Sequence, residues 1–413
     1  MKRSGTGLAG SPSNFKQMKK AVILVSFSFL LFPDLFSQSL GDYYSVIREE
    51  GQDPASFIEQ KLDRYDLIIF DDALHSALEP YMFVCDYLRD KPGSVNYIFL
   101  EATHMKVQAD IDSFLNKPVK DTSLLLNVFQ EDFTYGWLYE TYLTLFSTVW
   151  DINQHLPPEE KIRVIGVDQP VYWEGLHTRE DYNIFQQSLI ARDNYMYNRI
   201  MQYMGNFENG KKGIFITNTR HAYKCIRNEK GQPYWNAGTF FYSWHPGKTY
   251  SVRFHNMIMR IEAVDDKAGN ISSAGLERLE YSWVRMDDGL WDKAFTRNGN
   301  KPVAVPFKDN IFGEHPYIGN HMTDVLPGQT MYDAFDALIF LKPLEETRLS
   351  AHTKFYYTDE FKKELEHRIG VIQGHNLDSF LEQNGFDTVG EYIDKLSEYV
   401  PEMPNPLVSP ADN

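Results

Sequence analysis

The sequence predicts an α/β protein with a mostly parallel sheet flanked by helices. Short apolar runs rich in β-branched residues alternate along the chain with longer segments that have a helical period. The apolar runs are continuous rather than alternating, which is typical of strands covered on both faces. Hydrophobic residues make up 43% of the 413 positions, enough to build a large core. Strand–helix alternation of this kind favours a parallel sheet with helices on both sides.

Six strands are predicted from these apolar runs. Each is four or five residues long and most consist of Ile, Leu, Val and Phe. They cover residues 67–70, 97–100, 164–167, 214–217, 250–254 and 337–341.

Helices are predicted between the strands. A helical period runs through Leu78 and Leu88, a long apolar stripe runs from Leu138 to Leu156, and a third helix is predicted over Phe185–Ile200. Residues 287–335 are rich in Gly, Pro, Asn and His and predict long loops. The tail predicts two amphipathic helices, Glu360–Ile369 and Leu377–Tyr399, with Gly370 just past the end of the first.

These patterns divide the chain into three parts. Residues 1–38 are expected to be an upstream segment plus a signal peptide, and residues 39–345 an α/β domain of catalytic type. A mostly helical stretch at about 115–160 is expected to be an insertion in that domain. Residues 346–413 are expected to be a C-terminal helical extension.

The N-terminal region has the pattern of a secretory signal. A twelve-residue apolar run at 21–32 follows a basic flank and precedes small residues. The run is too short to span a bilayer comfortably, so we expect no stable membrane span once it is removed. An uncleaved anchor is the alternative, and Met18 could be the true start. The protein is therefore expected to be exported, either periplasmic or secreted.

The charge and the cysteines limit the classes of partner. A formal net charge of −16 repels phosphates and anionic lipid, so a small-molecule substrate is expected rather than nucleic acid. The oligomeric state is left open. Cys85 and Cys225 are the two cysteines, and export permits a disulfide between them, although two free thiols is the preferred interpretation.

Four of the predicted strands end in polar or ionisable residues. Carboxyl ends of parallel strands meet at one edge of a sheet, where ligands bind in doubly wound folds. Each ending alone has a plainer explanation, such as a helix cap. Four such strand endings in one chain favour a shared site. The endings are Asp71-Asp72 followed by His75, Glu101 followed by His104, Asp168 followed by Gln169, and Asn218 followed by Arg220-His221.

Crowded carboxylates and imidazoles are suited to acid–base chemistry. A histidine held by a carboxylate is a good general base for activating water. The same side chains could also hold a divalent metal, and their spacing does not choose between the two. The chain has no Gly-x-Ser-x-Gly motif, so a serine nucleophile has no support. Arg192 falls on the apolar stripe of its predicted helix and needs an anionic partner, unless it reaches solvent or Asp193.

The order of these motifs resembles the erythromycin esterase-like superfamily. Asp71–Ser76 is similar to its Gly-Glu-Ala-x-His-Gly element, and Val167–Pro170 to its Gly-x-Asp-x-Pro segment. Arg192-Asp193 with Met196 resembles its Arg-Glu-x-x-Met helix, and Thr219–Ala222 its late Gly-x-x-His element. The resemblance covers roughly residues 60–260. That superfamily is also similar to haem-binding iron-regulated lipoproteins and to pheromone-shutdown-type proteins.

The resemblance implies a hydrolase that acts on an ester or lactone. It assigns His75 as the base that activates water, with Asp72 and Glu101 holding the base or a proton. His221 and Arg220 are expected to stabilise the developing oxyanion, supported by Asp168 and Arg192. Whether the protein binds a metal or haem cofactor is left open. The alternatives are haem or metal binding without turnover, and a cell-surface interaction protein with a decayed site.

Three departures from the superfamily pattern concern the first motif. Asp71 and Ser76 replace glycines, and Asp72 replaces a longer glutamate, which puts its contact with His75 in question. Glu101–His104 resembles the motif even more closely. No later strand ends in Glu to serve as its partner, so His75 is preferred as the base.

Overall fold

The computed structural model describes residues 39–264, 278–319 and 324–408. The predicted signal peptide lies outside these residues. Leu40–Asn413 form one compact unit. The described stretches contain no helix with both the length and the apolarity needed to cross a bilayer.

Within the described residues, a seven-stranded sheet has the strand order β3-β2-β4-β1-β5-β9-β8. All neighbouring pairs in it are parallel except β8 with β9. Two smaller antiparallel pairs, β6–β7 and β10–β11, lie outside this sheet. The strands are β1 (Leu67–Asp71), β2 (Tyr97–His104), β3 (Arg163–Asp168), β4 (Gly213–Thr217), β5 (Thr249–Phe254), β6 (Ile258–Val264), β7 (Arg278–Val284), β8 (Val303–Pro306), β9 (Ala337–Phe340), β10 (Arg348–Leu349) and β11 (Met403–Pro404).

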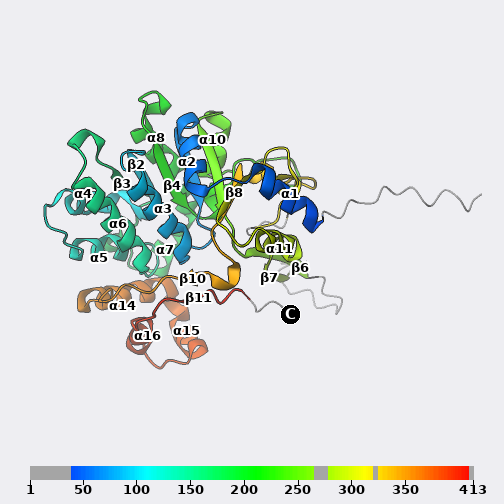
Figure 1. Cartoon of the computed structure of the whole chain (residues 1–413). Coiled ribbons are helices and arrows are strands. Elements are labelled where there is room, and N and C mark those ends of the chain that lie inside the picture. The colour runs from blue at the N-terminus through cyan, green and yellow to red at the C-terminus, as the bar shows by residue number, and fades with distance from the viewer. Residues whose placement is uncertain (1–38, 265–277, 320–323, 409–413) are drawn as a thin grey trace, which may run out of the picture. The chain divides into compact units, whose positions relative to one another are not determined.

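Helices cover both faces of the large sheet, and side chains alternate between two cores. Ile68 and Phe70 of β1 pack into the core that also contains residues of α2 to α6 and α14. Leu67 and Ile69 pack into the opposite core, with residues of α1, α8, α10 and α11. Figure 1 shows α4, α5 and α6 grouped on one side of the sheet and α14 to α16 below it.

The helices are α1 (Leu40–Glu50), α2 (Pro54–Arg64), α3 (Leu78–Asp90), α4 (Gln108–Asn116), α5 (Ser123–Gln130), α6 (Glu140–Asn153), α7 (Arg179–Ser188), α8 (Arg192–Met204), α9 (Thr219–Ala222), α10 (Ala237–Trp244), α11 (Leu290–Arg297), α12 (Ile311–Glu314), α13 (Met331–Ala334), α14 (Asp359–Gln373), α15 (Leu377–Asn384) and α16 (Val389–Leu396). Local signals fix several helix starts. Asp53 caps α2 with Pro54 at its first position, and a capping box of Thr178 and Asp181 begins α7.

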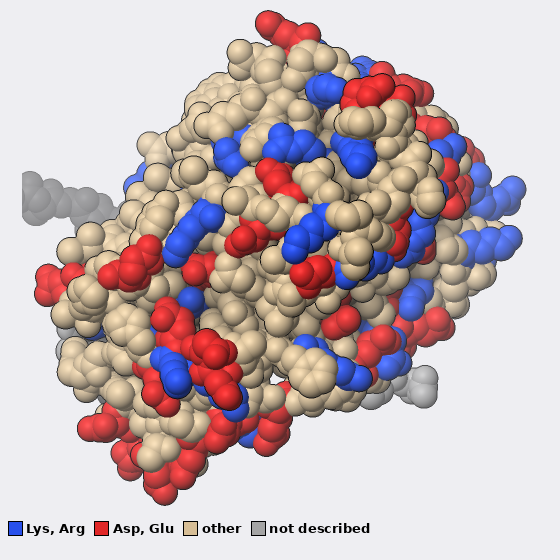
Figure 2. Space-filling view, turned by 90° about the vertical axis from the view of Figure 1, so that its left-hand side faces the viewer, with Lys and Arg blue, Asp and Glu red and all other residues tan. Residues whose placement is uncertain are grey.

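The α/β prediction and the six predicted strands are confirmed, as β1 to β5 and β9. The predicted insertion at 115–160 forms α5 and α6, and α6 packs against α3 over the sheet. Both cysteines are free thiols, with Cys85 buried on α3. Acidic and basic side chains are interspersed on the face in Figure 2, with acidic ones gathered at its lower end.

Four expectations about secondary structure were wrong. Residues 287–335 are not long loops, because they contain α11, β8, α12 and α13. The helix predicted over Phe185–Ile200 is two helices, α7 and α8, joined by a short 3-10 turn at Leu189–Ala191. The helix predicted over Leu377–Tyr399 breaks at Gly385, whose φ of +76° ends α15. Gly370 lies inside α14, which continues to Gln373.

Candidate active site at the carboxyl edge of the sheet

The strand order brings the predicted polar strand ends together. Because β4 lies between β2 and β1, the segments that follow these three strands are neighbours at one edge. A connected set of ion pairs and hydrogen bonds links most of the predicted side chains. Arg220 lies apart from it, at the wall of a pocket. The linked residues are Asp72, His75, Glu101, Asp168, Arg192 and His221.

A tight turn after β1 points His75 toward the other strand ends. Ala73 has a φ of +60°, which is uncommon for a residue with a Cβ, and its backbone N–H donates to Asp71 Oδ1. The turn brings Nδ1 of His75 to 3.0 Å from Asp72 Oδ2. Since a carboxylate only accepts, Nδ1 carries a hydrogen. Asp72, although shorter than glutamate, therefore reaches the imidazole.

Asp72 is completely buried and is held by a second donor. The hydroxyl of Tyr81 donates to the same Oδ2 atom, at 3.0 Å. Tyr81 is in turn in edge-to-face contact with Tyr142, and Trp137 contacts the His75 ring in the same way at 4.7 Å between centroids. Aromatic side chains thus fix the orientation of both the carboxylate and the imidazole.

Asn218 occupies the other nitrogen of His75. Its Oδ1 accepts from the backbone N–H of Arg220 as the N-cap of α9, so its amide NH₂ must point the other way. Nδ2 then lies 3.1 Å from His75 Nε2. An amide NH₂ only donates, so this contact requires a lone pair on Nε2.

Glu101 is the centre of the network and is almost fully buried. Its Oε2 accepts from the Thr217 hydroxyl at 2.5 Å and from the backbone N–H of Asn218. Its Oε1 faces cations: Arg192 Nη2 donates to it at 2.8 Å, and His221 Nε2 lies 3.3 Å away. Nε2 of His75 is 3.7 Å from the same oxygen.

Arg192 has the anionic partners that its sequence position required. Its Nε and Nη2 atoms donate to the two oxygens of Asp168 at 2.6 and 2.8 Å, a bidentate pair. The reason for burial differs from the prediction. Arg192 is the first residue of α8, whereas the predicted apolar stripe ran through a single helix from Phe185 to Ile200.

His221 is held between two carboxylates. Its Nδ1 lies 2.7 Å from Asp193 Oδ1, and its Nε2 faces Glu101. Asp193 also accepts from the backbone N–H of Ala237, which fixes the carboxylate. Both ring nitrogens of His221 are therefore occupied within the protein.

The charges in the network shift one another's pKa values. Burial disfavours the charged form of Glu101. His221 and His75 in their protonated forms, together with Arg192, outweigh burial and hold the pKa of Glu101 well below the usual range. Burial also opposes the charged form of His221, yet Asp193 and Glu101 raise its pKa to about 9. In the same way, Asp72 and Glu101 outweigh burial and raise the pKa of His75 well above its ordinary value.

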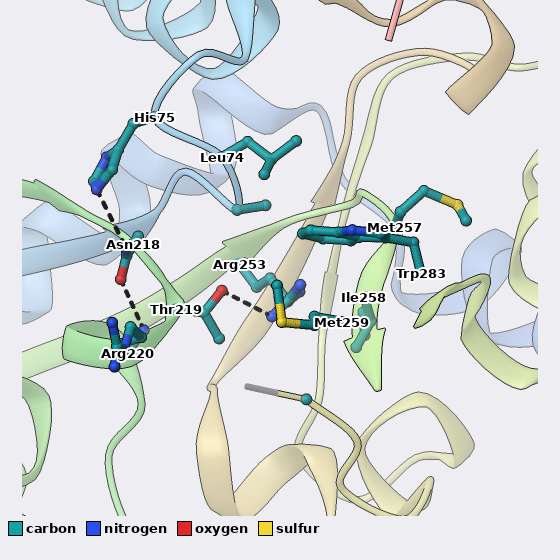
Figure 3. A pocket seen from close by; sticks show the side chains of 12 residues that line it. Leu74, His75, Asn218, Thr219, Arg220, Arg253, Met257, Ile258, Met259 and Trp283 are labelled. Carbon is teal, nitrogen blue, oxygen red and sulfur yellow. Dashed lines mark hydrogen bonds between the residues drawn. The ribbon is translucent and has the colours of Figure 1, made fainter. Parts of the chain in front are cut away.

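A pocket of about 210 Å³ opens beside His75. Figure 3 shows His75, Asn218 and Arg220 at one side of it and Met257, Met259 and Trp283 at the other. Arg220 is exposed, and within the described ranges its guanidinium has no carboxylate partner. It is therefore available to an anionic or carbonyl oxygen in the pocket.

Asp71 and Arg253 form a separate buried ion pair, and Arg253 also lines the pocket. Arg253 Nη1 donates to Asp71 Oδ2 at 3.0 Å, and the Thr219 hydroxyl also donates to this carboxylate. Asp71, which stands where the motif that the sequence resembles has glycine, is thus paired with a buried cation. Among the described residues, no group of three or more His, Cys, Asp or Glu side chains converges to hold a metal ion.

Sequence reasoning missed four contributors to the site. Asn218 was noted as a strand end but not as a contact of His75, although an Asn before a short helix signals a cap. Asp193 was considered only as an alternative partner of Arg192. Met259 and Trp283 come from β6 and β7, a hairpin that the sequence did not predict.

No family model and no curated protein matches the chain. Solved structures are similar to it over about three quarters of its length. They include a succinoglycan biosynthesis protein, with 10% identity, a TM-score of 0.49, and coverage of 74% of this chain and 97% of that one. A Bacillus cereus protein has 11% identity, a TM-score of 0.49, and coverage of 74% and 98%.

An erythromycin esterase variant in an open conformation is also similar. It has 9% identity and a TM-score of 0.49, and the match covers 73% of this chain and 95% of that one. An erythromycin esterase is thus among the solved structures that this chain is similar to, as the sequence resemblance predicted.

Proposed function

We propose that the protein is a hydrolase that cleaves an ester or lactone with water activated by His75. The observation that supports this most directly is the placement of the imidazole. Asp72 binds Nδ1, Asn218 contacts Nε2, and the ring borders the pocket with 16% of its side chain exposed. A histidine fixed in this way by a buried carboxylate is suited to general-base catalysis.

The reaction can be followed atom by atom. A water molecule first takes the place of the Asn218 amide at Nε2 of neutral His75. Nε2 then takes a proton from this water, whose oxygen bonds to the carbonyl carbon. Asp72 stabilises the imidazolium that forms. The bond to the leaving oxygen then breaks, and Nε2 returns the proton to that oxygen. The products are an acid and an alcohol, or a ring-opened hydroxy acid from a lactone.

Arg220 and Asn218 are the donors that we assign to the carbonyl oxygen. Arg220 lines the pocket, and the second N–H of the Asn218 amide is not needed by His75. His221 was expected to share this task. Because both of its nitrogens are bound to Asp193 and Glu101, we assign it instead to holding Glu101 in place.

The pH dependence follows from the charges around the base. The base must be neutral, while Asp72 and Glu101 raise the pKa of His75 and favour its protonated form. The neutral fraction therefore grows as pH rises. We expect hydrolysis to increase from neutral pH into the alkaline range.

A screen of esters and lactones, with and without a chelator, tests the proposal. Wild type should hydrolyse at least one substrate equally well in both conditions. Replacing His75 with Ala should lower its kcat by about 10²- to 10⁴-fold. His155, an exposed histidine outside the site, provides the control variant His155→Ala, which should keep its activity. Full activity in His75→Ala would contradict the assignment of the base.

We also propose that the protein is exported, because of the basic flank and the apolar run at 21–32. Expression of the full chain followed by cell fractionation tests this. N-terminal sequencing should find a mature chain that begins after the apolar run. A chain that keeps this run and stays in the cytoplasm contradicts export.

A further inference from the structure

The pocket beside His75 has two chemically different sides. One side carries the polar groups His75, Asn218, Thr219 and Arg220, and Arg253, which is paired with Asp71, lies between the two sides. The opposite side is apolar, and Figure 3 shows its side chains turned toward the same space. The apolar side consists of Leu74, Met257, Ile258, Met259 and Trp283.

Most of the apolar side is built by the β6–β7 hairpin. Met259 and Trp283 are directly opposite each other in its register, and both line the pocket, so they lie on one face. Met257 and Ile258, just before and at the start of β6, are buried, and Ile258 belongs to the core with α8 and α10. The wall is therefore anchored in the body of the protein.

The size of the pocket limits its occupant. A volume of about 210 Å³ is smaller than the roughly 300–1,000 Å³ typical of sites for drug-sized ligands. Gly319 lies at the pocket near Ile258, where an added Cβ would meet Ile258 Cγ2 at 3.5 Å. A short alkyl chain or a single ring suits this space better than a macrocycle.

We infer that the pocket is a subsite for a short apolar group joined to the ester carbonyl, with Met259 and Trp283 as the residues that select it. The carbonyl faces His75 and Arg220, and the apolar group extends along the hairpin face. The reaction in this inference rests on the proposed function, whereas the binding preference does not. Methionine adapts its shape, which suits a wall that accepts several short chains.

A series of p-nitrophenyl esters from acetate to hexanoate tests the subsite. Each added methylene that is buried should raise kcat/KM by about fourfold until the pocket is full. Trp283→Ala and Met259→Ala should each reduce the rise of kcat/KM with chain length. Trp244→Ala removes a half-exposed tryptophan from α10, outside the pocket, and should leave the dependence as in wild type. A matching series of acetate esters with longer alcohols shows which side of the carbonyl the subsite binds.

A binding measurement separates this inference from the proposed function. Propan-1-ol and hexan-1-ol are titrated into wild type and Trp283→Ala by calorimetry. Tighter binding of hexan-1-ol that is lost in Trp283→Ala supports the subsite, even if no ester is hydrolysed and the proposed function fails. Equal affinity of wild type for the two alcohols, together with a flat ester series or one unchanged in both wall variants, overturns the subsite and leaves hydrolysis untouched.

Discussion

Two histidines lie at the carboxyl edge of the sheet in opposite environments. His75, after β1, has Asp72 at one ring nitrogen and Asn218 at the other, and it borders the pocket. His104, at the end of β2, is 3% exposed, and neither of its ring nitrogens has a hydrogen-bond partner among the residues that the structure describes. Asp72 and Glu101 raise the pKa of His75 against the effect of burial, whereas burial lowers the pKa of His104 to about 4.

The comparison shows that partners, rather than the motif around a histidine, decide its chemistry. Glu101–His104 has the closer likeness to the superfamily motif, yet its imidazole faces no carboxylate at hydrogen-bonding distance. Glu101 instead turns toward Arg192 and His221. The choice of His75 as the base, made from strand order, stays a prediction.

The largest effect on the free energy of unfolding is expected when Glu101, the carboxylate near His75, loses its charge. Glu101→Gln keeps the shape but leaves buried cations without their shared partner, so the free energy of unfolding should fall by about 3–5 kcal/mol. Glu131→Gln is the matched change near His104. Glu131 pairs with Lys106 in a partly exposed ion pair, and its loss should cost about 1 kcal/mol or less. Urea unfolding measures both, and equal losses would contradict the comparison.

The two regions should lose stability at opposite ends of the pH scale. The folded pKa of His221, which shares Glu101 with His75, is about 9, above the ordinary 6.5. Its stabilising contribution is complete below 6.5 and is lost as pH rises through 9. For His104 the folded pKa is about 4, so its contribution is complete above 6.5 and is lost as pH falls through 4. Each of these two pKa shifts corresponds to about 3 kcal/mol of unfolding free energy.

Unfolding free energies measured between pH 4 and pH 9.5 test this pair of expectations. His221→Asn should flatten part of the alkaline decline, and His104→Leu part of the acidic decline. Glu101 also contributes on the acidic side, because its lowered pKa means that its stabilisation is lost as pH falls. The expectation is wrong if both variants change the decline of unfolding free energy at the same end of the pH range.

A smaller effect is expected from Asn218→Asp. Aspartate still caps α9, but it replaces an NH₂ donor beside His75 Nε2 with a third carboxylate. The pKa of His75 should rise further, and the rate of hydrolysis at pH 7 should drop by about tenfold. Activity should recover in part as pH is raised, while loss of the donor to the carbonyl oxygen persists at every pH. A uniform loss at every pH would contradict the expected rise in the pKa of His75.

The smallest effect is expected at His104 itself. Because its ring nitrogens have no hydrogen bonds to lose, His104→Leu should change stability at pH 7 by about 1 kcal/mol or less. Hydrolysis should be unaffected. Thermal unfolding and the ester assay check both points, and a large loss of activity would move the catalytic role toward the end of β2.

The sequence was sufficient for six of the seven strands of the large sheet, all but β8, and for most side chains of the network. Continuous apolar runs ending in polar residues identified the strands and the side chains at their ends. The break between α7 and α8 was not visible, since Leu189, Ile190 and Ala191 favour helix and contain no Gly or Pro. Ile190 is apolar but 93% exposed there.

The sequence pattern also gave no signal for the antiparallel pair β6–β7. Its strands mix apolar, charged and polar residues without a clean alternation, because they form a separate pair rather than joining the large sheet. The contact of Asn218 with His75 depends on which way one amide points, and that direction is set only once α9 has formed.

The side-chain amide of Asn218 contacts both the first turn of α9 and the imidazole of His75. One atom of Asn218 is committed to the first turn of α9 and another to the nitrogen that would accept the proton from water. If the turn opens, the amide is free to rotate, and the imidazole loses the neighbour that favours its neutral form. Local folding of four residues and the protonation state of His75 are therefore thermodynamically linked, so a ligand that binds and orders α9 would also lower the pKa of His75.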